Sequence, residues 1–134
     1  MSDFFKFVSR DVASNPVARA LAKRRIESAI RDFLLELYFL EDGAEQRENY
    51  LAAARVLAVA IRLVEMKGID LMGPMRGALS CCQQASERGF KWRRLDAVAI
   101  DTGLCAALEV INAASASEVQ RAWAFVMDLE RAAA

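Results

Sequence analysis

The chain has 134 residues, and its eighteen basic side chains balance its eighteen acidic ones, so that the formal net charge is zero. A chain of this length is the size of one domain, and an apolar fraction of 55% is enough for a buried core. This composition excludes intrinsic disorder, and the zero net charge argues against a generally basic surface for nucleic acid. The chain has no histidine, and therefore lacks the most common general base at neutral pH and the most common metal ligand.

Residue usage predicts an all-α protein. Alanine and leucine, which lead the scale of helix propensity, are abundant, whereas threonine occurs once, at Thr102. No apolar run is long enough to cross a membrane, and the first residues lack the long apolar stretch of a signal peptide. Three cysteines, two of them adjacent, do not make a disulfide framework. We therefore expect a cytoplasmic protein, and the alanine- and arginine-rich usage is typical of bacteria.

The first predicted elements are a short helix over residues 2–13 and a long helix over residues 16–40. Apolar side chains share one face of the short helix. Asn15 and Pro16 predict the start of the long helix, because asparagine is a good N-cap and proline suits the first helical position. Apolar residues then repeat with heptad spacing as far as Leu40.

A second long helix is predicted over residues 44–66, with the same heptad spacing and with Gly68 beyond its end. Because the linker from the helix over residues 16–40 is short, we expect the two to form an antiparallel hairpin. The residues expected to face each other are Ile30, Phe33 and Leu37 on the first helix and Tyr50, Leu57 and Ile61 on the second.

Three further helices complete an expected single-domain bundle of five or six helices. The helix over residues 92–113 is apolar nearly all round, which predicts a central position. Gly103 within it predicts a kink or a close helix contact. The last helix is expected to start at a capping box, formed by Ser115 with Glu118 or by Ser117 with Gln120. The three predicted ranges are 74–88, 92–113 and 117–131.

No pattern of catalytic residues is present. Without histidine, Ser-His and Cys-His nucleophile pairs are impossible, and no glycine-rich phosphate-binding motif occurs. Acidic residues between positions 41 and 48 are best explained as partners of a helix dipole. Adjacent Cys81 and Cys82 point about 100° apart on a helix and cannot bridge without distortion of the backbone, so we expect them to be small core and near-surface residues. Cys105 lies in the most apolar predicted helix, and we expect it to be a packing residue. We expect neither a catalytic residue, nor a cofactor, nor a metal site.

Two basic clusters are candidate sites for phosphate or nucleic acid. The second of them surrounds Phe90 and Trp92, and arginines beside aromatic rings can bind phosphates while the rings stack on bases. The alternative interpretation is that the rings pack, and that the cations stay solvated or pair with acids such as Glu87 and Asp96. The clusters consist of Arg19, Lys23, Arg24 and Arg25, and of Arg88, Lys91, Trp92, Arg93 and Arg94.

An apolar run from Phe33 to Leu40 is the feature that bears most on function. Only Glu36 interrupts it, so this end of the helix is apolar on every face, and only one face can meet the core. The remaining side chains must be covered by the rest of the chain, in particular residues 4–7, or by a second subunit or a protein partner. The side chains concerned are Leu34, Leu35, Tyr38 and Phe39.

These observations favour a non-catalytic protein that binds another protein as an adaptor, inhibitor or regulator, and that acts as a homodimer. The alternative is a nucleic-acid-binding regulator that uses the basic clusters at residues 19–25 and 88–94. A third hypothesis is an enzyme or small-ligand protein with a pocket lined by Met72, Met75 and aromatic residues. We expect no membrane association.

Overall fold

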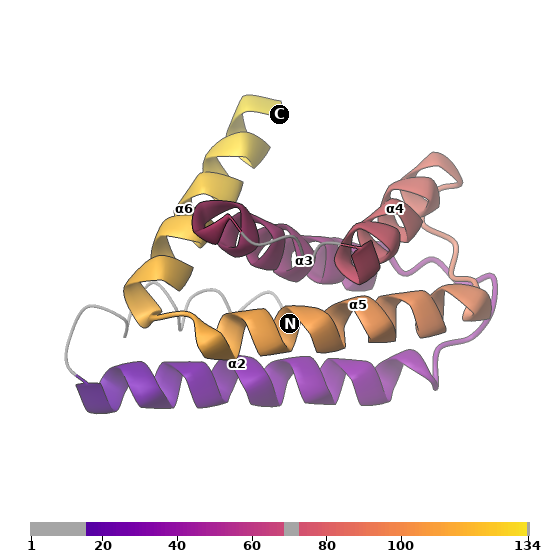
Figure 1. Ribbon diagram of the computed structural model, residues 1–134. Coiled ribbons are helices and arrows are strands. Elements are labelled where there is room, and N and C mark those ends of the chain that lie inside the picture. Colours follow the sequence, from indigo (N-terminus) through magenta and orange to yellow (C-terminus); the bar gives the residue numbers. More distant parts are fainter. Residues whose placement is uncertain (1–15, 69–72, 134) are drawn as a thin grey trace.

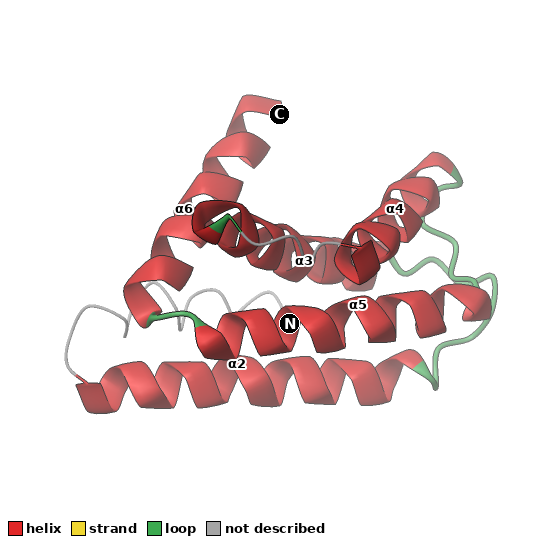
Figure 2. Ribbon diagram, in the orientation of Figure 1, coloured by secondary structure: helices red, strands yellow, loops and turns green. Residues whose placement is uncertain are grey.

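The computed structural model describes residues 16–68 and 73–133, and over these ranges the fold is all-helical (Figure 2). The described helices lie close to the predicted ranges, and the short helix predicted over residues 2–13 lies outside the described residues. The helices are α2 (Pro16–Leu37), α3 (Arg47–Lys67), α4 (Gly73–Glu87), α5 (Arg94–Ala113) and α6 (Ala116–Ala133).

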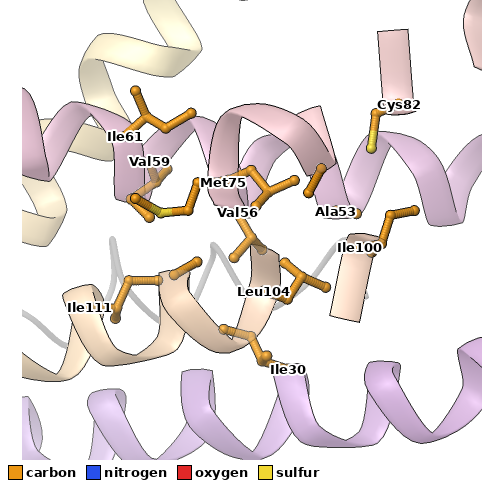
Figure 3. Packing of buried hydrophobic residues seen from close by; sticks show 14 of the residues in the cluster. Ile30, Ala53, Val56, Val59, Ile61, Met75, Cys82, Ile100, Leu104 and Ile111 are labelled. Carbon is orange, nitrogen blue, oxygen red and sulfur yellow. The ribbon is translucent and has the colours of Figure 1, made fainter. Parts of the chain in front are cut away.

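Helix α5 occupies the centre of the fold, as its apolar sequence predicts. It packs against α2, α3 and α4, and it runs antiparallel to α2 (Figure 1). Ile30 of α2 points toward Leu104 of α5, and Val56 of α3 approaches α5 from the other side (Figure 3). All three side chains are at most 1% exposed. The core is therefore built in layers, with α5 between α2 and α3.

The predicted hairpin between residues 16–40 and 44–66 is wrong. Among the described residues, α2 packs mainly against α5, while α3 packs against α4, α5 and α6. The residues between α2 and α3 do not make a tight turn. Their backbone forms hydrogen bonds with the loop that precedes α5, and these residues therefore pass across the start of α5. The heptad pattern correctly predicts which residues are buried, namely Ile30, Phe33 and Leu37 on α2 and Tyr50, Leu57 and Ile61 on α3, although it predicts the wrong partner helix.

Gly103 lies at a close contact between α5 and α4, as the sequence predicts. A Cβ atom at this position would overlap the Cβ of Ala78 and would lie 3.0 Å from the backbone oxygen of Pro74. Leu57 of α3 would be 3.2 Å away. Glycine therefore lets α4 and α5 approach each other more closely than any larger residue would allow.

The start of α6 is the predicted capping box, in its Ser115 and Glu118 form. The backbone N–H of Ser115 donates to Oε1 of Glu118 at 2.8 Å, and the backbone N–H of Glu118 donates to Oγ of Ser115 at 3.2 Å. The bond from the backbone of Ser115 is the main cause that lowers the pKa of the Glu118 carboxyl. Because these bonds satisfy N–H groups at the end of the helix, they fix where α6 begins.

Candidate functional site

Two loops, residues 38–46 after α2 and residues 88–93 before α5, are bonded to each other through their backbones. The N–H of Gly43 donates to the carbonyl of Trp92, and the N–H of Trp92 donates to the carbonyl of Ala44, both at 2.7 Å. The N–H of Gln46 donates to the carbonyl of Phe90 at 2.8 Å. These bonds explain why α3 begins at Arg47 and α5 begins at Arg94. The backbone groups just before each helix form hydrogen bonds with the other loop and are not available for helical hydrogen bonds.

A buried polar network holds the second of these loops. Nη2 of Arg88 donates to Oδ2 of Asp96 at 2.5 Å and to the hydroxyl of Tyr50 at 2.9 Å. The Tyr50 hydroxyl also donates to Oδ2 of Asp96 at 2.8 Å. Burial, followed by this bond to Asp96, raises the pKa of Tyr50 to about 12. The network joins α3, the residue that follows α4 and the first turn of α5.

Trp92 lies inside the fold, at 1% exposure. Its ring centroid is 5.1 Å from that of Tyr50, in a tilted aromatic contact. Stacking of this ring on a nucleic-acid base would require the loop over residues 88–93 to open. Of the two interpretations of the second basic cluster, the pairing of its cations with acids is confirmed for Arg88, whose partner is Asp96.

The remaining cations of the two clusters lie on separate parts of the molecule. Lys91, Arg93 and Arg94 are exposed at the start of α5. Arg24 and Arg25 are exposed in the first half of α2, at the opposite end of that helix from the loop before α5 (Figure 1). Arg19 and Lys23 also lie on α2, in a part where the structure describes only the backbone. The structure therefore does not bring the two clusters together into one basic face.

Three of the four side chains predicted as a partner interface are exposed. The exposed fraction is 66% for Leu35, 51% for Tyr38 and 85% for Phe39. Leu34 is different, because it is half-buried and packs against the core. The other described helices therefore leave the end of α2 uncovered.

This exposed apolar surface continues from α2 onto α5. The Tyr38 hydroxyl donates to Oδ2 of Asp101, which brings the end of α2 against α5 close to Val98, three residues before Asp101. Val98 is 65% exposed, and Leu95, three residues before it, is 81% exposed. We refer to Leu35, Tyr38, Phe39, Leu95 and Val98 together as the α2–α5 surface.

Leu95 and Val98 were not predicted as site residues. The sequence of α5 is apolar nearly all round, and such a helix is usually enclosed by its neighbours. In the structure α2, α3 and α4 cover most of α5 but leave the side that carries Leu95 and Val98 uncovered. The sequence does carry a signal that could have predicted their exposure. Helix α5 has large apolar residues on nearly every side, and the chain has too few other helices to cover all of them.

Asp42 joins the loop after α2 to the start of α5. Its Oδ1 accepts a hydrogen bond from the backbone N–H of Arg94 at 2.9 Å, at the start of α5. A carboxylate at this place also complements the positive end of the helix dipole. This hydrogen bond thus joins the loop that follows Phe39 to the backbone that precedes Leu95.

Cys105 is not the packing residue that the sequence predicts, because its side chain is exposed on α5. Its Sγ lies 3.3 Å from Oδ1 of Asp101. Partial burial and this hydrogen bond both raise the pKa of the thiol, which lowers the fraction of reactive thiolate. Cys82 is buried, and burial raises its pKa to about 12. This environment does not activate either thiol as a nucleophile.

Other observations bear on the remaining hypotheses. Met75, expected in one hypothesis to line a ligand pocket, is fully buried in the core, and Met72 lies outside the described residues. In residues 16–68 and 73–133, no three potential metal-ligating side chains lie together. None of the described helices is long and apolar enough to cross a membrane. Comparisons of the chain with protein-family models, curated proteins and solved structures find no match.

Proposed function

We propose that this chain is a non-catalytic adaptor, inhibitor or regulator that binds another protein through the α2–α5 surface and works as a homodimer in the cytoplasm. The single observation that supports protein binding is the exposure of five large apolar side chains across two adjacent helices. Soluble monomers rarely expose contiguous apolar patches beyond a few hundred Å², and larger ones are typical of interaction sites.

The composition and the rigidity of the surface both favour a protein partner. It combines leucine and valine with Tyr38 and Phe39, and aromatic residues are enriched at the centres of protein interfaces. Tyr38 is held by Asp101, and the loop that follows it is held by Asp42 at the start of α5. Because Tyr38 and the backbone of this loop are already held, binding through this end of the surface orders less of the chain than binding through a mobile loop would.

The proposal is tested by placing a photo-crosslinking amino acid at Phe39 in the full chain and irradiating it in cells of the source organism. We expect one dominant covalent product with a protein. The matched control carries the crosslinker at Arg131, whose side chain is 79% exposed and lies on α6, away from the surface. Equal products from both positions, or none from Phe39, would contradict the proposal.

Binding of the captured partner is then measured for purified variants. Changing Leu35 to glutamine and Phe39 to lysine is expected to weaken binding at least tenfold, because truncating a central apolar contact costs more than about 1 kcal/mol. Both side chains are exposed, so the helical content should not change. An unchanged affinity would exclude this surface as the binding site.

Nucleic-acid binding is the alternative function. The observation in its favour is that Lys91, Arg93 and Arg94 are exposed near one another at the start of α5. Its support is weaker, because Trp92 faces the core and Arg88 is bound to Asp96. The remaining cations suit a phosphate contact without base recognition.

A further inference from the structure

We draw no further inference here: the strongest candidate, the apolar groove that α3, α4 and α6 form beside Phe125 and Leu129, carries none because nothing in the structure shows what covers it.

Discussion

Arg88 and Asp96 lie on either side of the turn between α4 and α5, and their side chains meet with Nη2 2.5 Å from Oδ2. Arg88 also donates from Nε to the carbonyl of Lys91 at 3.0 Å, inside the same turn. Tyr50 of α3 bonds to both side chains of the pair. One arginine, which in sequence belongs to a cluster of candidate phosphate ligands, therefore ties three helices together.

Changing Asp96 to asparagine is expected to lower the free energy of unfolding by about 1.5–3 kcal/mol, the range for hydrogen bonds to charged groups. Asp96 is 5% exposed, and asparagine keeps an acceptor oxygen but removes the negative charge, so that the hydrogen bonds from Arg88 and Tyr50 are no longer made to a charged group and the Arg88 guanidinium loses its ion pair. Urea unfolding measures the change. The control is Asp128→Asn, whose ion pair with Arg131 is exposed and should contribute less than about 1 kcal/mol. Equal losses of stability in the two variants would show that the buried pair contributes no more than the exposed one.

Alkaline titration should show a phenol that ionises unusually late. Tyr50 has a pKa of about 12 in the fold, against 10.0 ordinarily, because burial and the bond to Asp96 disfavour the phenolate. Its proton is held more tightly in the folded state, so this contribution to stability is complete below pH 10 and is lost as the pH rises from 10 to about 12. Ultraviolet absorbance of tyrosinate follows the titration, and Tyr50→Phe should remove the late step. If the late step persists in this variant, Tyr38 is the residue that ionises late, and the prediction for Tyr50 is wrong.

Gly103→Ala should destabilise the protein, although alanine is the better helix former. The added Cβ would overlap Ala78, and such overpacking costs about 1–3 kcal/mol. Gly77→Ala is the matched control, since it is also inside a helix but has open space around its added Cβ, and it should stabilise by about 0.4–1 kcal/mol. Thermal unfolding of the two variants should give shifts of opposite sign. A stabilised Gly103→Ala would mean that α4 and α5 are farther apart.

Trp92→Ala should destabilise the fold, and a nucleic-acid titration separates the two candidate functions. Trp92 is a core residue, and the substitution should lower the free energy of unfolding by about 3–5 kcal/mol. Trp92→Phe should cost less, because it keeps a ring and removes an indole N–H that has no hydrogen-bond partner among the described residues. Fluorescence anisotropy of labelled single- and double-stranded nucleic acid should show no binding to the wild-type chain at physiological salt. Tight binding that weakens with salt would favour the alternative.

The sequence predicted the local features of this fold well, because each depends on nearby residues. Gly68 in a left-handed conformation ends α3, and Ser115 with Glu118 starts α6. The close contact at Gly103 was also expected, because a glycine weakens the interior of a helix and is tolerated there when a neighbouring helix needs the space. Signals at the helix ends act through backbone conformation or hydrogen bonds within a few residues.

The choice of partner for each helix was beyond the sequence. Heptad spacing shows that Leu37 and Leu57 are buried, but any apolar seam of similar spacing fits them equally well. The bonds from Gly43 to the loop before α5 direct the chain away from a hairpin, and they join residues far apart in sequence. Leu34 illustrates the same difficulty at the candidate site, where the pattern grouped it with exposed neighbours although it packs against the core.

The packing of α2 on α5 has a consequence for how the chain folds. Helices α3, α4 and α5 follow one another in sequence and pack together, whereas α2 meets α5 only across all of the intervening chain. Closing a longer loop costs more entropy and slows folding, so we expect α3 to α5 to order first and α2 to join afterwards. In native-state hydrogen exchange, α2 should open at a lower free energy than α3. Each such opening would expose the side of α5 that packs against Ile30 of α2. It would also separate, for a short time, the two halves of the α2–α5 surface.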